Sequence, residues 1–175
     1  GSAFAEAARK DPSLLAPQMA LARLDSAAGR HDAAIKRLSD ALATHERNTD
    51  LQFELAGAWE RRGRADEAQR WLEKAIESAH PRDFRPAIAL VDLHLRQNRP
   101  AEALAEAKRL ASKAPNDLSP QMTLAKMHIA VNDRDSARLT LTSAARLAGF
   151  DPADQVEIGL LQQVVGNREG ATYSF

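Results

Sequence analysis

PQMALAR at residues 17–23 returns as PQMTLAK at residues 120–126, a distance of 103 residues. A near-copy this far along the chain indicates internal repeats of one structural unit. Gly or Asn then recurs at spacings of 34, 35, 34 and 34 residues, and these types commonly end a helix in the left-handed conformation. The recurring residues are Gly29, Gly63, Asn98, Asn132 and Gly166. The sequence therefore predicts repeated helical hairpins, and positions below are counted from these turn residues.

Small and large apolar residues keep fixed distances from each turn. Alanine stands five residues after all five turns, where two helices are expected to approach closely. A branched aliphatic residue stands eight before each turn, and apolar residues nine and twelve after it complete an amphipathic stripe. The alanines are Ala34, Ala68, Ala103, Ala137 and Ala171, and the aliphatic residues are Leu21, Leu55, Leu90, Leu124 and Ile158. Both helices of each hairpin are therefore predicted to be amphipathic.

The pattern resembles the tetratricopeptide repeat, a 34-residue helix–turn–helix unit with small, large and small core positions. The resemblance covers nearly the whole chain and implies an all-α, right-handed superhelical solenoid of antiparallel helix pairs. Two features depart from the family pattern: its usual first-helix tryptophan is absent, and the aromatic position four before the turn varies. That position holds Asp25, Trp59, His94, His128 and Gln162.

The repeat frame also divides the chain. Gly1-Ser2, with no Met before it, is interpreted as a cloning scar. Residues 3–14 are predicted to be the second helix of a preceding repeat, because Phe4, Ala7 and Pro12 fall at its expected positions. Repeats are predicted at 15–48, 49–83, 84–117 and 118–151, with a partial repeat at 152–175. Such a chain is expected to be a piece of a longer solenoid.

A binding surface is expected on the first helix of each hairpin, since these helices line the concave face of a stacked array. The apolar members are predicted to contact an extended or helical partner segment, and the charged members to set its orientation. Burial of the apolar members in the core is the alternative. The predicted partner-binding residues are Met19, Arg23, Phe53, Glu60, Ile88, Asp92, Leu95, Arg96, Met122, Lys126 and Ile129.

The sequence gives little support for nucleic-acid binding, membrane insertion, catalysis or metal binding. Lys plus Arg and Asp plus Glu both total 24, so no net field favours nucleic acid or an anionic membrane. No apolar run is long enough to span a bilayer, and cysteine is absent. No nucleophile elbow, phosphate-binding loop or dinucleotide motif occurs, so neither an enzyme nor a cofactor is predicted. His94 and His128 share one repeat position; we expect them to fill space as Trp59 does, with a metal site or pH-sensitive pair as the alternative.

These observations predict a protein-interaction scaffold that binds a protein or peptide. A structural spacer without a ligand of its own is the alternative. The chain also loosely resembles repeat arrays of bacterial envelope, exopolysaccharide and exosortase-linked secretion proteins, which implies a periplasmic or envelope-associated location. End-to-end self-association through apolar repeat ends is a further expectation.

Overall fold

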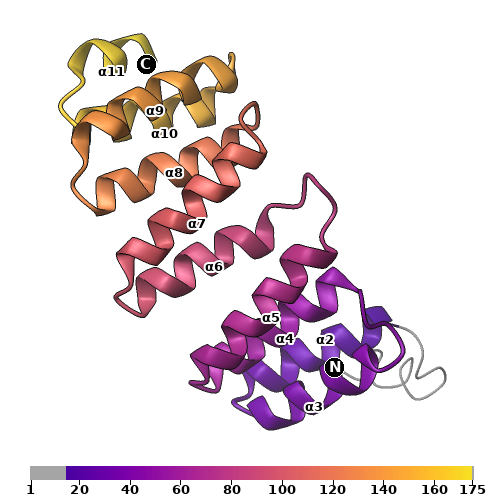
Figure 1. The fold of residues 1–175 in the computed structure, drawn as a ribbon. Coiled ribbons are helices and arrows are strands. Elements are labelled where there is room, and N and C mark those ends of the chain that lie inside the picture. Colours follow the sequence, from indigo (N-terminus) through magenta and orange to yellow (C-terminus); the bar gives the residue numbers. More distant parts are fainter. Residues whose placement is uncertain (1–14, 175) are drawn as a thin grey trace. The chain divides into compact units, whose positions relative to one another are not determined.

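The computed structural model describes residues 15–174, and within that range the chain forms ten α-helices and no strand (Figure 1). The predicted all-α fold of paired helices is thereby confirmed. Residues 1–14 and Phe175 lie outside the described range, so the helix predicted at 3–14 does too. The chain divides into two compact units, Gly1–Pro86 and Ala87–Phe175, and each is described by itself.

The first unit contains two helical hairpins. Helices α2 (Leu15–Ala27) and α3 (His31–Leu42) form one hairpin, and α4 (Thr49–Arg61) and α5 (Ala65–Ser78) form the next. Helix α3 also packs on α4, so the hairpins are stacked. Helix α6 (Arg85–Arg96) begins with the last two residues of this unit.

The second unit continues the alternation with α7 (Pro100–Lys113), α8 (Leu118–Ala130), α9 (Arg134–Ala148), α10 (Pro152–Val164) and α11 (Arg168–Ser174). Helices α8 and α9 form a hairpin, as do α10 and α11. The stacking contacts are α7 with α8 and α9 with α10. None of the helices in the described range has the length and apolar character needed to cross a membrane.

The five predicted turns end their helices as expected. All five turn residues have positive φ, from 57° at Asn98 to 79° at Gly63. At Gly63 the amide donates to the carbonyl of Glu60 at 2.8 Å, and the next amide, of Arg64, donates to that of Trp59 at 2.9 Å. This pair of hydrogen bonds satisfies carbonyls that a helix end leaves free. A Cβ at Gly63 would meet nothing within 4 Å, so backbone conformation rather than space favours glycine there.

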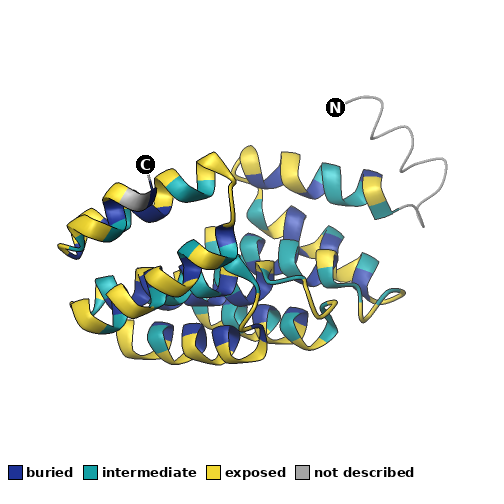
Figure 2. Ribbon diagram, turned by 90° about the horizontal axis from the view of Figure 1, so that it is seen from above, coloured by how far each residue is buried: buried dark blue, intermediate teal, exposed yellow. Residues whose placement is uncertain are grey.

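The alanines five residues after each turn are buried, with exposed fractions between 0% and 3%. They lie among large aliphatic side chains that are equally buried, such as Leu55 and Leu141 at 0%. Figure 2 shows that each helix carries both buried and exposed residues, as an amphipathic helix does. The five alanines are therefore core residues, as the repeat pattern predicts.

A glutamine eleven residues before the turn joins the first helix of a hairpin to the loop before it through a hydrogen bond. The Nε2 of Gln52 donates to the carbonyl of Glu46 at 2.7 Å, and the Nε2 of Gln155 donates to that of Gly149 at 2.6 Å. Gln121 makes the equivalent bond to Pro115 at 3.3 Å. Each bond joins a first helix to the loop before it and satisfies a loop carbonyl.

Candidate protein-binding surface

The first helices of the hairpins are α2, α4, α6, α8 and α10, and they carry all the predicted partner-binding residues. The side of each first helix that holds the positions ten, six and three residues before the turn is called the first-helix face below. In the first unit Arg23 on α2 donates through Nε to Glu54 Oε1 on α4 at 2.7 Å. This hydrogen bond, with the Coulombic attraction, raises the pKa of Arg23. The pair bridges two neighbouring first helices.

The ring of Phe53, on the same face, has the guanidinium group of Arg85 against one side. The guanidinium carbon of Arg85 lies 5.8 Å from the centroid of the Phe53 ring. Arg85 Nη2 also lies 2.7 Å from Asp83 Oδ2 and 2.8 Å from Asp50 Oδ1. These two carboxylates raise the pKa of Arg85, and Arg85 in turn lowers that of Asp83. The half-buried ring and the anchored guanidinium form a compact aromatic and cationic surface.

The second unit repeats the ion pair between first helices. Lys126 Nζ on α8 lies 2.7 Å from Glu157 Oε1 on α10. Lys126 stands six residues before its turn and Glu157 nine before the next, the same positions as Arg23 and Glu54. Both members of this pair are about half exposed. The same position of the first helix thus places a cation on this face in each unit.

The apolar members of the predicted set differ in burial. Met122 is 7% exposed and belongs to a core cluster with Leu141 and Ile158. Met19, Leu95 and Ile129 are partly buried and pack against core clusters, and Ile88 is partly buried as well. The charged Asp92 and Arg96 are exposed, and Glu60 is partly buried. The charged residues are therefore the more accessible part of the predicted set, and Met122 contributes to packing.

The predicted set omitted the most exposed apolar residues of the first-helix faces, which lie on α10. Val156 and Leu160 are 47% and 53% exposed, and Val164, next to this face at two residues before the turn, is 59% exposed. Their spacing of four residues places them along one side of the helix. The spacing was visible in the sequence, but a sequence does not reveal which repeats have their apolar positions covered.

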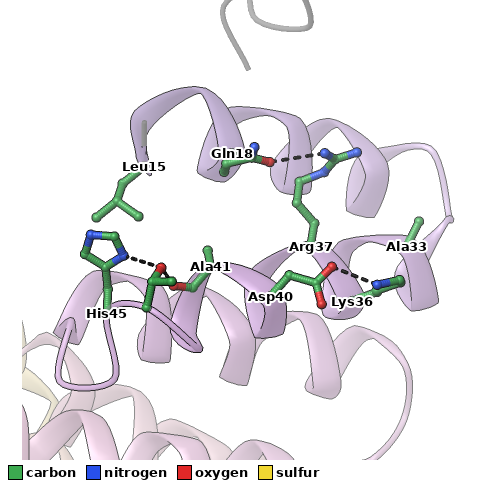
Figure 3. A pocket seen from close by; sticks show the side chains of 9 residues that line it. Leu15, Gln18, Ala33, Lys36, Arg37, Asp40, Ala41 and His45 are labelled. Carbon is green, nitrogen blue, oxygen red and sulfur yellow. Dashed lines mark hydrogen bonds and ion pairs between the residues drawn. The ribbon is translucent and has the colours of Figure 1, made fainter. Parts of the chain in front are cut away.

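A cleft of about 710 Å³ lies beside α2 and α3 in the first unit (Figure 3). Its polar side chains are already joined in pairs. Arg37 Nη1 donates to Gln18 Oε1 at 3.2 Å, and Lys36 Nζ lies 2.8 Å from Asp40 Oδ2. The opening is bounded by Leu15, where the described chain begins. We assign no ligand to this cleft.

Arg37, which lines this cleft, also binds a buried carboxylate, that of Asp25. Asp25 is 8% exposed, and its two oxygens accept from Arg30 Nη2 at 2.8 Å and Arg37 Nη2 at 3.2 Å. Burial by itself raises the pKa of Asp25, but the hydrogen bonds from Arg30 and Arg37 outweigh it and lower the pKa. The ionised carboxylate thus ties the end of α2 to α3.

His94 and His128 are both 6% exposed, which agrees with a space-filling role at the repeat position of Trp59. Within residues 15–174, no three His, Cys, Asp or Glu side chains are grouped as metal ligands. His128 Nδ1 lies 3.4 Å from Asp133 Oδ2. Burial lowers the pKa of His128 by more than the nearby Asp133 raises it. Folding therefore favours the neutral form of His128.

Acidification is expected to destabilise the second unit through His128. Because the folded pKa lies below the unfolded value of about 6.5, stability is full above that pH and falls as pH drops toward the folded pKa. His128→Gln copies Gln162, which occupies the same position in the next repeat. Urea titrations at pH 7.5 and 5.5 are expected to show a smaller acid loss for H128Q than for the unmodified chain. His80→Gln, at an exposed loop residue, is the control; an equal acid loss in all three proteins would refute the assignment.

Two models of known protein families match parts of this chain. One tetratricopeptide repeat model matches residues 26–91, and a second matches residues 85–109. Residues 26–109 therefore match tetratricopeptide repeats. Such repeats generally act as non-catalytic protein-interaction scaffolds. No curated protein sequence matches the chain.

Solved structures share the tetratricopeptide fold at low identity. Pseudomonas aeruginosa PilF is 22% identical with a TM-score of 0.67, covering 98% of this chain and 78% of its own. A tetratricopeptide repeat protein of Parabacteroides merdae is 14% identical with a TM-score of 0.66, covering 99% and 68%. YrrB, described as having an unusual peptide-binding site, is 17% identical with a TM-score of 0.59, covering 98% and 88%. At these identities the likeness concerns the fold.

Proposed function

We propose that the chain is a protein-interaction scaffold whose first-helix faces bind a segment of a partner protein. The tetratricopeptide repeats support the general role. The observation that carries the surface is that Arg23 and Lys126, six residues before their turns, are exposed cations on these faces, each paired with a carboxylate of the following first helix, Glu54 or Glu157. Surface pairs of this kind contribute at most about 1 kcal/mol each, so a partner's charges can replace them at little cost.

The proposed ligand is a short peptide segment with both apolar and charged side chains. Phe53 and its neighbour Arg85 offer an aromatic and a cationic contact in the first unit. Asp92, Arg96 and Lys126 offer charged contacts in the second unit. Peptide binding by YrrB, a protein of similar fold, agrees with a ligand of this class.

A structural spacer is the second candidate, and a specific observation favours it. Met122 is covered by the core, and Met19, Ile88, Leu95 and Ile129 are partly buried, which leaves fewer apolar groups for a ligand. A periplasmic or envelope-associated location, with a part in export, stays a prediction from the loose resemblance.

Charge exchange on the first helices is expected to abolish partner capture. The double variant Asp92→Lys with Lys126→Glu keeps the net charge of the chain and changes only exposed residues. A matched control exchanges charges on the second helix α9, through Asp135→Lys with Arg146→Glu. Proteins captured from a lysate of the source organism are identified by mass spectrometry for all three chains, after circular dichroism shows equal helix content. Loss of a captured protein with the first-helix variant alone supports the scaffold, whereas equal capture by all three favours the spacer.

A further inference from the structure

A cation lies on the first-helix face of α4, although this helix has glycine where α2 and α8 have Arg23 and Lys126. Gly57 stands six residues before the turn of α4. A Cβ placed on Gly57 would meet three guanidinium atoms of Arg61 at 3.4, 3.6 and 3.8 Å. The guanidinium of Arg61 therefore lies over Gly57, in the space that a longer side chain at residue 57 would occupy.

A hydrogen bond from α2 fixes this guanidinium on its other side. Arg61 Nη2 donates to Ser26 Oγ at 3.4 Å, and Ser26 is 6% exposed. Ser26 follows Arg23 by three residues on α2, so this bond lies about one helical turn from the bridge between Arg23 and Glu54. Because the guanidinium of Arg61 is positioned before a ligand arrives, a ligand that binds it loses less entropy in ordering the site.

The partner of Arg61 differs from those of the neighbouring arginines in the first unit. Arg23 pairs with Glu54, and Arg85 pairs with two carboxylates. Within residues 15–174, Arg61 bonds to the hydroxyl of Ser26 and to no carboxylate. Arg61 is also exposed. Its positive charge is therefore left for a carboxylate of another molecule.

An aromatic side chain stands next to this cation. Phe53 precedes Gly57 by four residues, so it lies one helical turn from the guanidinium of Arg61. Side chains in this relation are about 5–6 Å apart. In an extended peptide, the residues on one side are two positions, or about 6.6 Å, apart. An extended ligand would thus place an apolar side chain on Phe53 and a carboxylate on Arg61 if the two residues were separated by one other.

We propose that the first-helix face of α4 binds an extended peptide segment in which an apolar residue and an acidic residue are two positions apart. This rests on the proposed scaffold function and specifies its ligand. The acidic residue pairs with Arg61, and the apolar residue packs on Phe53. A basic residue fits less well, because the α4 carboxylates of Glu54 and Asp50 already pair with arginines.

Two synthetic peptides with blocked ends test the proposed ligand. The first is Ser-Phe-Thr-Asp-Ser, and the second has Asn in place of Asp, which removes the charge and keeps the shape. Titration of the isotopically labelled full chain, followed by NMR chemical shifts, measures dissociation constants into the millimolar range. We expect the Asp peptide to bind about threefold to fivefold more tightly, as an exposed ion pair allows. The amide of Gly57 is expected to be among the resonances that shift.

Three variants test whether Arg61 causes the preference for the Asp peptide. Arg61→Gln removes the cation and is expected to bind both peptides equally. Arg47→Gln is the control, because it makes the same charge change at an exposed loop residue before α4 and is expected to keep the preference. Gly57→Leu fills the space that the guanidinium occupies, so it is also expected to lose the preference. Leucine favours a helix more than glycine does, so urea unfolding of G57L is expected to show no loss of stability.

Several results would overturn the proposal. Equal affinity of the unmodified chain for the two peptides is one, and the absence of shifts with either peptide is another. A preference that persists in R61Q, or that R47Q loses to the same extent, would show that Arg61 is not the determinant. Partner capture from a lysate is a separate readout: a chain that captures a protein but does not distinguish the peptides would keep the scaffold function and refute this ligand.

Discussion

Leu141→Ala is expected to lower the free energy of unfolding of the second unit by about 2–5 kcal/mol. Leu141 on α9 is 0% exposed and lies in the core cluster with Met122, Ala137 and Ile158. Removing most of its side chain loses burial of apolar surface and leaves a cavity that backbone and neighbours fill only in part. Urea unfolding followed by circular dichroism measures the change.

The same helix supplies a matched control. Leu139 stands two residues before Leu141 and is 74% exposed. Leu139→Ala therefore makes the same change in helix propensity as Leu141→Ala but removes almost no buried apolar surface. We expect its effect to stay within about 0.5 kcal/mol. Equal effects of the two substitutions would contradict the described packing of α9.

Ala34→Leu is expected to destabilise the first unit by about 1–3 kcal/mol. Ala34 is 0% exposed and stands at the position that is alanine in all five repeats. A longer side chain at a close helix contact forces α3 away from its neighbours or into a strained rotamer. Thermal and urea unfolding of the variant provide the measurement.

Ala33→Leu is the control for this overpacking. Ala33 precedes Ala34 on α3 and is exposed at the cleft beside α2, so a leucine there meets no packed neighbour. Its expected effect is within about 0.5 kcal/mol. A loss of stability for A33L as large as for A34L would show that helix propensity, not packing, explains the alanines.

The helical fold was predictable because its determinants are local and repeat along the chain. Gly63 and Asn98 identified helix ends through the left-handed conformation, and the alanines identified buried positions of the second helices. Five copies of one pattern let each position be checked against four others. A single amphipathic segment would not have allowed this.

The binding surface was less predictable, because exposure depends on what covers a position rather than on its residue type. Met122 and Val156 occupy the same repeat position and are both apolar, yet their exposed fractions are 7% and 47%. The bridging of Arg23 to Glu54 likewise depends on the register between neighbouring hairpins. The glutamine that joins hairpins at Gln52 and Gln155 was visible as PQM at residues 120–122, but its loop partners became evident only from the fold.

Hydrogen–deuterium exchange of the chain with and without its captured partner measures which helices the partner covers. We expect the partner to slow exchange in peptides from the first helices, chiefly α4, α6 and α8, and to leave α5, α7 and α9 unchanged. Peptides from first and second helices are separable because the helices alternate along the chain. Slower exchange confined to the second helices would contradict a binding surface on the first helices.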